Sequence, residues 1–320
     1  MLFCVKGGKK EAVEFKIALV NVLLTLAYTM LGVLLCKIKK GTAEHLPTMS
    51  GALIYGCTPF LVLNSFMAID YTPEILVQMG LFFVASAITQ GGFLALLYGL
   101  LRKKREDAKY RVATLAAIAG NAGFFGIPIV RALLPNHPEV MCYACMYIVA
   151  MNVIAFTVGV FFLTGKKEYM TIRAAILNPT MLGLLLALPL FIFGWFDRLP
   201  DVVTGGISAL STMTTPLCMI ILGIRLSTVS PKQLFGNPMV YLACALKLFI
   251  FPLFCYGLAL LFPLSHAFRG ALLILSATPC ASIVLNLAEM HGSETELSAN
   301  CVLLSTLMCC ISIPLLSLLL

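Results

Sequence analysis

The sequence predicts an all-α polytopic membrane protein with ten transmembrane helices. We expect them to form a 5+5 inverted repeat in which helices 4 and 9 are broken and cross each other. The 320 residues are 60% hydrophobic and only 11% charged, whereas charged residues make up about a quarter of an average soluble domain. The mean hydropathy of +0.99 therefore indicates a chain whose solvent is a lipid bilayer. A further observation, matched interruptions in the two halves, predicts the repeat.

Ten apolar runs, separated by charged or Gly/Pro-rich breaks, are the candidate spans. Each is long enough to cross the hydrocarbon core, which takes about 20 helical residues. The loops are short, so we expect no separate soluble domain, and the two repeats cover residues 1–165 and 166–320. The predicted spans are 15–36, 48–68, 74–101, 111–131, 139–164, 170–195, 202–226, 237–262, 268–289 and 296–320.

The Lys and Arg residues of the loops predict the orientation, because cytoplasmic loops carry the excess of positive charge. Fourteen lie in the loops after spans 1, 3, 5, 7 and 9, and three lie in the loops after spans 2, 4, 6 and 8. Both termini are therefore predicted to lie outside the cell membrane. Four lysines before span 1 oppose this assignment, and the other loops outweigh them. The fourteen are Lys37, Lys39, Lys40, Arg102, Lys103, Lys104, Arg105, Lys109, Arg111, Lys166, Lys167, Arg173, Arg225 and Lys232; the three are Arg131, Arg198 and Arg269; the four are Lys6, Lys9, Lys10 and Lys16.

The interruptions fall at corresponding places in the two halves. Span 2 carries Pro59 in "YGCTPFLVLNSF" and span 7 carries Pro216 in "TMTTPLCMIILG". Span 4 breaks at "GNAGFFGIP" and span 9 breaks at Pro279 in "SATPCASIVLN". Single prolines are common in membrane helices, but paired interruptions are typical of inverted-repeat transporters with a site at the repeat interface. We therefore favour the repeat.

The break in span 4 predicts a binding site for an anion. Gly120, Gly123 and Gly126 allow unusual backbone conformations and the close approach of a crossing helix. Pro128 leaves a carbonyl unpaired about one turn upstream. If spans 4 and 9 cross at their breaks, two half-helix N-termini present free N–H groups and partial positive charge at one place. Asn121 lies in the break and is the leading candidate for a side-chain contact.

The interior polar residues of the chain are amides rather than carboxylates. All fourteen Asp and Glu fall in predicted loops or at span ends, whereas a proton or cation pump usually keeps a carboxylate at mid-membrane. An amide can donate to a substrate carboxylate or coordinate a cation, and each could instead form a helix–helix hydrogen bond. Besides Asn121, these amides are Asn64, Gln90, Asn152, Asn286 and Asn300.

Three ionisable residues are further candidates for a role in the site. Lys247 lies well inside span 8, where it could bind the substrate anion, contact a carbonyl at a helix end, or reach the nearer interface. Glu289 and His291, at the end of span 9, could relay protons that couple to transport. A solvated helix end is the simpler interpretation of this pair.

Several classes of protein are excluded by what the sequence lacks. It has no Gly-rich phosphate loop, no metal-spaced His/Cys set and no hydrolytic nucleophile–base arrangement, so we expect no enzyme, no cofactor and no metal. The Lys and Arg clusters have no interleaved aromatic residues, which argues against nucleic-acid binding. The pair Cys142/Cys145 spells CxxC outside any βαβ context, so we interpret both as small apolar residues of one helix.

The chain resembles the auxin efflux carrier family over nearly its whole length. The most specific match is "GNAGFFGIPIV" in span 4, which is similar to the family's G-N-x-x-x-x-G-x-P signature. Weaker matches are "TPFLVL", "TPLCMIILGIRL", "TPCASIVLNLAEMHG" and "LLSTLMCCISIPLL". The middle loop near 165–170 is much shorter than that of the plant carriers, so nothing about auxin or loop phosphorylation carries over.

This resemblance implies an elevator-type transporter of organic anions. Spans 1, 2, 6 and 7 would form a scaffold and a homodimer surface, and spans 3–5 and 8–10 would form a moving transport domain. The family's crossover asparagine corresponds to Asn121, and its crossover prolines correspond to Pro128 and Pro279. Family members move auxin or small carboxylates such as malate and malonate. After Pro279 the chain offers Ser282, in a stretch that does not align well enough to assign a second ligand.

We therefore expect a secondary-active or facilitative carrier of a small mono- or dicarboxylate, with possible coupling to protons or sodium. Auxin-like acids are also possible substrates. One alternative is a sodium-coupled organic-anion symporter of the bile-acid class, in which amides and carbonyls bind the ion. Another is a membrane sensor that binds a ligand without moving it. The matched breaks argue against a sensor, because alternating access needs the pseudo-symmetry and sensing does not.

Overall fold

The structure is a computed structural model, which describes the backbone of residues 2–104 and 106–320 and the side chains of residues 13–104 and 106–320. Within these ranges the secondary structure is helical, without a named strand. Eight helical segments are long and apolar enough to cross a membrane, which confirms the all-α polytopic class. Four side chains counted for the orientation, those of Lys6, Lys9, Lys10 and Arg105, lie outside the described residues.

The eight segments correspond to predicted spans 1–3, 5–8 and 10. Several contain a 3-10 or π-helical stretch, labelled η, between α-helical pieces. They are α1 (Leu2–Lys37); η1 (Ala43–His45), α2 (Leu46–Gly51), η2 (Ala52–Cys57) and α3 (Thr58–Met67); α4 (Pro73–Leu100); α7 (Val140–Ile154), η5 (Ala155–Gly159) and α8 (Val160–Thr164); η6 (Lys167–Tyr169), α9 (Ile172–Ile176) and α10 (Pro179–Ile192); α11 (Asp201–Ser227); α13 (Pro238–Ala245), η8 (Leu246–Ile250) and α14 (Phe251–Leu260); and α17 (Thr295–Ser317). Loops contain η3 (Arg102–Lys104), η7 (Phe196–Arg198) and α12 (Pro231–Phe235).

Predicted spans 4 and 9 are not among the eight, because each is divided into shorter helices. Span 4 consists of α5 (Ala108–Ile118), the π-helical η4 (Ala122–Gly126) and α6 (Ile127–Leu133). Span 9 consists of α15 (His266–Ser276) and α16 (Ile283–His291). Residues 119–121 and 277–282, between these helices, are not helical. No single piece is long enough to cross a bilayer, so the ten-span inverted repeat stays a prediction.

The prolines of spans 2 and 7 loosen their helices less than the sequence predicts. α11 runs without a break through Pro216. In span 2 the π-helical η2 comes directly before α3, which contains Pro59, and the Thr58 hydroxyl donates to the Leu53 carbonyl at 2.9 Å. Proline removes one donor from the helix, and π-helical adjustments of the neighbouring turns can absorb this loss. A proline alone therefore does not predict a break in this chain.

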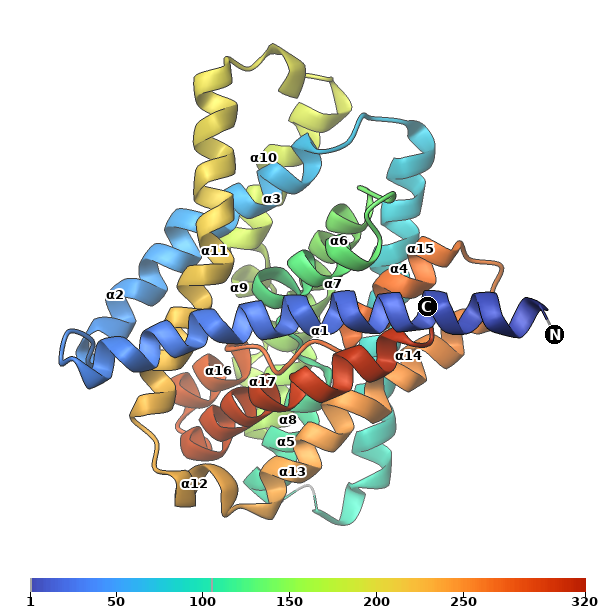
Figure 1. Cartoon of the computed structure of the whole chain (residues 1–320). Helices are drawn as coiled ribbons and strands as arrows, with labels where there is room; N and C mark the ends of the chain where they lie inside the picture. Colours follow the sequence, from blue (N-terminus) through green and yellow to red (C-terminus); the bar gives the residue numbers. More distant parts are fainter. Residues whose placement is uncertain (1, 105) are drawn as a thin grey trace.

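Figure 1 shows α1 in dark blue across the front of the molecule, where it packs against α11 and α17. Two glycines bring α1 and α11 unusually close. A Cβ atom on Gly223 would lie 1.9 Å from the Thr29 carbonyl oxygen, and one on Gly32 would lie 2.2 Å from the Ile220 carbonyl oxygen. Small residues let membrane helices approach through their backbones, which increases van der Waals contact where lipid gives no hydrophobic driving force.

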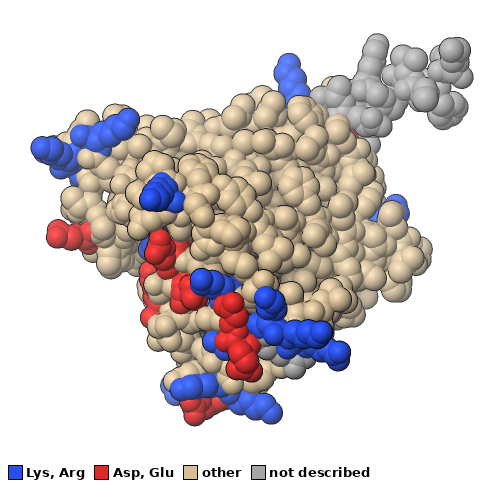
Figure 2. All heavy atoms as spheres, turned by 90° about the horizontal axis from the view of Figure 1, so that it is seen from below, with Lys and Arg blue, Asp and Glu red and all other residues tan. Residues whose placement is uncertain are grey.

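The outer surface of the protein fits a lipid environment. Large apolar side chains point outward on several helices, among them Leu23, Val77, Ile88 and Leu186, which are 50–62% exposed. Such extensive apolar exposure is unusual for a water-soluble protein. Figure 2 shows that most of the Lys, Arg, Asp and Glu side chains on the face it displays gather toward one side and leave a wide area almost without charge. The remaining elements pack inward, with α3 against α10 and α11, α4 against α7, and α14 against α15.

Candidate functional site

The non-helical residues of α5–η4 and α15–α16 pair with each other in an antiparallel bridge between Gly120 and Cys280. The Asn121 N–H donates to the Pro279 carbonyl at 2.8 Å, and the Ala281 N–H donates to the Ala119 carbonyl at 3.0 Å. We call this bridge, residues 119–121 with 279–281, the crossing. Because lipid cannot satisfy backbone groups, interrupted helices must find such partners inside the protein.

Two glycines make room for the crossing. A Cβ atom on Gly120 would lie 2.5 Å from the Thr278 hydroxyl and 2.9 Å from the Lys247 ammonium nitrogen. A Cβ atom on Gly126 would lie 2.9 Å from Thr278 Cγ2 and 3.0 Å from Leu275 Cδ2. A Cβ atom at either position would force the neighbouring side chains to move, in agreement with the close approach that the sequence predicts for this stretch.

Lys247 lies behind the crossing and contacts a helix end. Its side chain is fully buried, and its Nζ donates to the Ser276 carbonyl at 2.6 Å, at the C-terminus of α15. The Nζ also lies 5.0 Å from the centroid of the Phe251 ring. A cation is favourable at this end of the helix dipole. Of the three roles considered for this lysine, the structure shows the contact with a carbonyl at a helix end. Because the Nζ is buried, the side chain does not reach the membrane interface.

A cavity of about 470 Å³ lies on the other side of the crossing. We call it the central cavity. Six residues that the sequence analysis singles out line it, namely Gly120, Asn121, Gly123, Asn152, Ser282 and Asn286. Its walls come from η2, α3, η4, α6, α7, η5, α9, α10 and α16, and no charged side chain is among the described residues that line it. The lining combines amides and hydroxyls with large apolar groups, in particular Tyr55, Phe124, Ile148, Met151 and Phe156.

The Asn121 side chain bridges the crossing to α11. It is 6% exposed, and its Nδ2 lies 3.9 Å from the Cys218 sulfur. Three residues earlier, the Thr215 hydroxyl donates to the Phe124 carbonyl in η4 at 2.7 Å. The sequence analysis did not nominate Thr215 or Cys218. Their position in "TTPLC", on either side of Pro216, is the signal that could have indicated them.

Asn152 and Asn178 form a second contact between the walls of the cavity. The Asn152 Nδ2 lies 3.5 Å from the Asn178 Oδ1, and the same oxygen accepts from the Met181 N–H at 2.9 Å. Asn178 is thus the N-cap of α10. An Asn followed by Pro is a typical start of a helix. Sequence reasoning nominated Asn152 as an interior amide and missed Asn178.

The remaining nominated residues lie elsewhere. Asn64 accepts from the Ser208 hydroxyl at 3.0 Å, and Asn300 donates to the Gln233 carbonyl at 3.1 Å. Pro128 lies in the first turn of α6, and Gly126 and Pro279 belong to the packing around the crossing. None of these side chains lines the central cavity.

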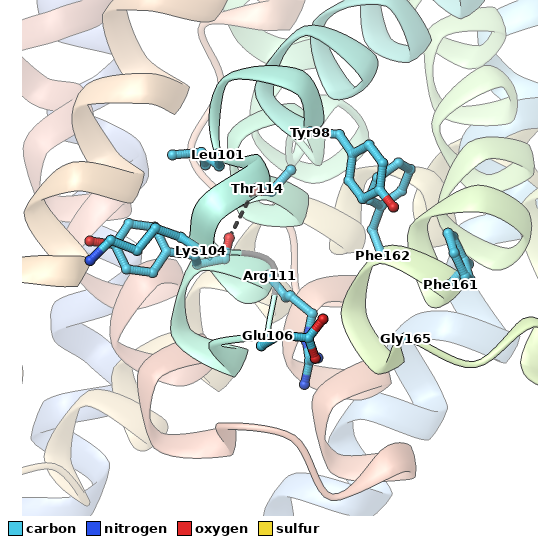
Figure 3. A pocket seen from close by; sticks show the side chains of 10 residues that line it. Tyr98, Leu101, Lys104, Glu106, Arg111, Thr114, Phe161, Phe162 and Gly165 are labelled. Atoms are coloured by element: carbon cyan, nitrogen blue, oxygen red, sulfur yellow. Dashed lines mark hydrogen bonds between the residues drawn. The ribbon is translucent and has the colours of Figure 1, made fainter.

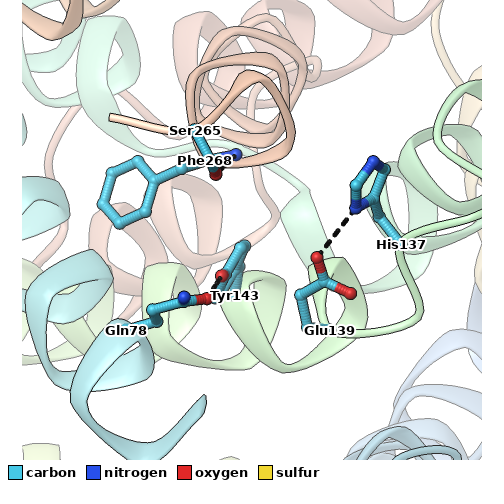
Figure 4. A network of polar contacts seen from close by, with 6 residues as sticks. All are labelled: Gln78, His137, Glu139, Tyr143, Ser265 and Phe268. Carbon is cyan, nitrogen blue, oxygen red and sulfur yellow. Dashed lines mark hydrogen bonds and ion pairs between the residues drawn. The ribbon is translucent and has the colours of Figure 1, made fainter. Parts of the chain in front are cut away.

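The two coupling candidates also lie outside the central cavity. Glu289 pairs with Arg225 of α11 at 3.3 Å. The His291 ring lies 4.6 Å from the Tyr169 ring, beside a separate cavity of about 300 Å³. A hydrogen bond joins α4 and α7, in which the Tyr143 hydroxyl donates to Gln78 at 2.6 Å, and in the segment before α7 His137 contacts Glu139 at 3.0 Å (Figure 4). Within the described residues, no group of three or more His, Cys, Asp and Glu could hold a metal ion.

Comparison with known proteins identifies the family to which the chain belongs. Residues 17–317 match the family described as "Membrane transport protein". An uncharacterized transporter of Methanothermobacter thermautotrophicus is 26% identical over 303 residues, covering 92% of this chain and 96% of its own. An uncharacterized transporter of Methanocaldococcus jannaschii is 24% identical over 269 residues, covering 82% and 86%. The expected membership in the auxin efflux carrier family is confirmed, and the chain belongs to this family of multi-pass membrane transporters.

Proposed function

We propose that the protein carries a small organic anion across the membrane, with the central cavity as its binding site. The observation that supports this most directly is the position of the cavity against the crossing. Asn121 offers an amide there, and the N-termini of η4 and α16 begin nearby. Amide donors and helix N-termini favour a carboxylate. The buried ammonium of Lys247, directly behind Gly120, adds positive potential without touching the ligand.

The chemistry of the lining favours a monocarboxylate with an apolar body. A second carboxylate would enter a cavity whose described lining contains no Lys, Arg or His. Burying a charge without a partner is costly, typically several kcal/mol. Tyr55, Phe124 and Phe156 would instead contact an aliphatic or aromatic body. Among the mono- and dicarboxylates that the sequence allows, we therefore favour the monocarboxylates.

An elevator movement is consistent with the contacts between the walls. The proposed scaffold contributes α3, α10 and α11, and the proposed transport domain contributes η4, α7 and α16. Among the described residues, the polar bonds between them include Asn121 with Cys218, Thr215 with the Phe124 carbonyl, Cys142 with the Ser65 carbonyl, Asn152 with Asn178, and Arg225 with Glu289. Each such bond adds about 1 kcal/mol or less net, so a domain could exchange them during movement. We propose the inverted repeat and homodimer as the setting of this movement.

We propose that the central cavity opens toward the side that the loop charges predict to be cytoplasmic. Its lining extends from Asn121 at the crossing to Ala174, Leu177 and Met290. Ala174 and Leu177 lie near the loop after span 5, whose Lys166, Lys167 and Arg173 predict a cytoplasmic location. Met290 lies at the end of span 9, an odd-numbered span that ends on the same predicted side. We propose that the structure represents an inward-facing state, with both termini outside the cell membrane.

Solute counterflow in liposomes tests the proposed function. Purified protein is reconstituted and preloaded with unlabelled phenylacetate, hexanoate or malate, and uptake of the same labelled compound is measured. We expect counterflow of the two monocarboxylates to exceed that of malate. Faster counterflow of malate would overturn the preference for monocarboxylates. Ligand-induced thermal stabilisation without counterflow of any acid would favour the non-transporting sensor.

Replacing sodium by choline in the same liposomes tests the coupling. Loss of uptake in choline would identify the sodium-coupled symporter, whose ion would need amide and carbonyl ligands. Uptake that is unchanged in choline but follows an imposed pH gradient would identify proton coupling, for which Glu289 and His291 are the proposed groups. Uptake indifferent to both would identify a facilitative carrier.

A further inference from the structure

Two smaller cavities meet at Arg111, at the end of the protein opposite the predicted extracellular loops. The first, of about 230 Å³, is lined by side chains of α4, η3, α5 and α8 (Figure 3). The second, of about 300 Å³, lies between α5, α8, η6 and the α16–α17 loop. Arg111 lines both, Lys104 lines the first and Lys166 lines the second. Neither cavity shares a residue with the central cavity.

The Arg111 guanidinium has no partner in the described part of the chain. Its Nε is buried without a hydrogen bond, and no ion pair to another described side chain involves it. A buried donor without a partner costs about 1–3 kcal/mol. Gly165 ends α8 in the left-handed conformation (φ 75°) and lies beside the guanidinium. A Cβ atom on Gly165 would lie 3.6 Å from Arg111 Nη1. The arginine is thus held between two cavities with donors that an anion could use.

The surroundings of Arg111 are positively charged. Within 102–104, 106–111 and 166–173 there are eight Lys and Arg and three Asp and Glu. One carboxylate lines each cavity, Glu106 in the first and Glu294 in the second, and neither pairs with Arg111 within ion-pair distance. The eight are Arg102, Lys103, Lys104, Lys109, Arg111, Lys166, Lys167 and Arg173, and the three are Glu106, Asp107 and Glu168.

The first cavity also has an aromatic side. The Tyr98 and Phe162 rings contact each other edge to face with centroids 4.4 Å apart, and Figure 3 shows them together with Phe161 on one side of the cavity. On α4, the neighbouring Leu96 and Leu100 are 45% and 70% exposed. Aromatic side chains concentrate where lipid headgroups meet the hydrocarbon core. Acyl chains could therefore lie along α4 while a headgroup enters the cavity.

We propose that the Arg111 cavities bind the phosphate group of an anionic phospholipid. The planar guanidinium can donate two parallel hydrogen bonds to phosphate oxygens, and Lys104 and Lys166 add charge on either side. Basic pockets between transmembrane helices on the cytoplasmic side are suited to such headgroups. A bound lipid would join α5, the helix that leads into the crossing, to α4 and α8 at the membrane surface. The proposal is independent of the substrate in the central cavity.

Thermal unfolding of the purified full-length chain in phosphatidylcholine vesicles tests the proposal. Short-chain phosphatidylglycerol is titrated in one arm and inorganic phosphate in the other, and affinity is obtained from the rise in the unfolding midpoint. We expect phosphatidylglycerol to stabilise the protein, and Arg111→Gln to weaken its binding about 10- to 100-fold. Arg111→Lys, which keeps the charge but loses the fork, should give an intermediate loss.

Arg269→Gln is the matched control, since Arg269 is also a partly exposed arginine of a helical first turn and lines none of the three cavities. Equal phosphatidylglycerol affinity in the Arg111 and Arg269 variants would overturn the proposal. Inorganic phosphate that binds as tightly as phosphatidylglycerol would overturn the assignment to a lipid in favour of a soluble anion.

If Arg111→Gln does not fold, a photoactivatable phosphatidylglycerol with the wild-type chain replaces it. Crosslinks within 98–114 or 161–169 would support the site, and crosslinks only elsewhere would overturn it.

Discussion

Replacing Asn121 by alanine tests the binding site at a single side chain. The backbone N–H of residue 121 donates to the Pro279 carbonyl and remains in the variant, so the crossing keeps both hydrogen bonds. The side chain loses one long contact, 3.9 Å from Nδ2 to the Cys218 sulfur. A weak neutral hydrogen bond contributes about 1 kcal/mol or less. We therefore expect Asn121→Ala to lower the free energy of unfolding by no more than about 1 kcal/mol.

The effect on the substrate should be larger than the effect on folding. In the proposed complex the amide donates to a carboxylate, and hydrogen bonds to charged groups contribute about 1.5–3 kcal/mol. This range corresponds to a loss of affinity of about 10- to 150-fold. Counterflow of labelled phenylacetate in liposomes measures the loss in transport, and substrate-induced thermal stabilisation measures the loss in binding.

Asn64→Ala is the control for this experiment. Asn64 is also an interior amide, but it pairs with Ser208 and does not line the central cavity. We expect this variant to keep substrate affinity although it loses a shorter hydrogen bond, of 3.0 Å, than Asn121→Ala does. Unchanged transport in Asn121→Ala, or equal losses in both variants, would refute the assignment of Asn121 to the substrate.

Three further predictions concern folding and movement. Gly223→Ala should lower the free energy of unfolding by at least about 1–3 kcal/mol, because its Cβ would lie 1.9 Å from a carbonyl oxygen of α1; Gly205→Ala in the same helix, with nothing within 4 Å, should not lower it, and equal unfolding midpoints would contradict the close packing. Thr215→Val removes the donor to the η4 carbonyl and should change the counterflow rate while the crossing stays intact; a rate identical to that of the wild type would show that this contact is not exchanged. Glu289→Gln removes the ion pair with Arg225, which is partly exposed and contributes under about 1 kcal/mol. Counterflow should become faster and less dependent on salt, and an undiminished salt dependence would argue against a role for this pair.

The membrane class and most spans follow from the sequence because they depend on local composition. In lipid, the backbone N–H and C=O groups of a run of about 20 apolar residues must pair with each other, and a helix pairs them within the run. Eight of the predicted spans are long apolar helices in the structure. The interruption at Gly120 and the one near Pro279 are also local signals. The same reasoning is wrong at Pro216, where α11 continues, because one missing donor can be absorbed within a helix.

The contacts that complete the candidate site depend on packing and are not visible in one sequence. Thr215 and Phe124 are 91 residues apart, and Asn121 and Cys218 are 97 residues apart. A rule based on spacing treats all interior amides alike, yet Asn121 and Asn286 line the central cavity and Asn64 does not. The role of Lys247 could not be chosen from the sequence either. Its position behind Gly120 in the structure is what separates a contact with a helix-end carbonyl from a direct contact with the substrate.

The crossing has a consequence for how the protein is made. Its bridge joins Gly120 to Cys280, so 280 − 120 = 160 residues must be synthesised between the two partners. At about 5–20 residues per second, the backbone of residues 119–121 waits roughly 10 to 30 seconds in the membrane for residues 279–281. During this time its N–H and C=O groups need water, the translocon or another protein, because lipid cannot pair them. Chains truncated before Pro279 should therefore be cleaved by protease near residues 119–126, whereas full-length chains should resist cleavage there.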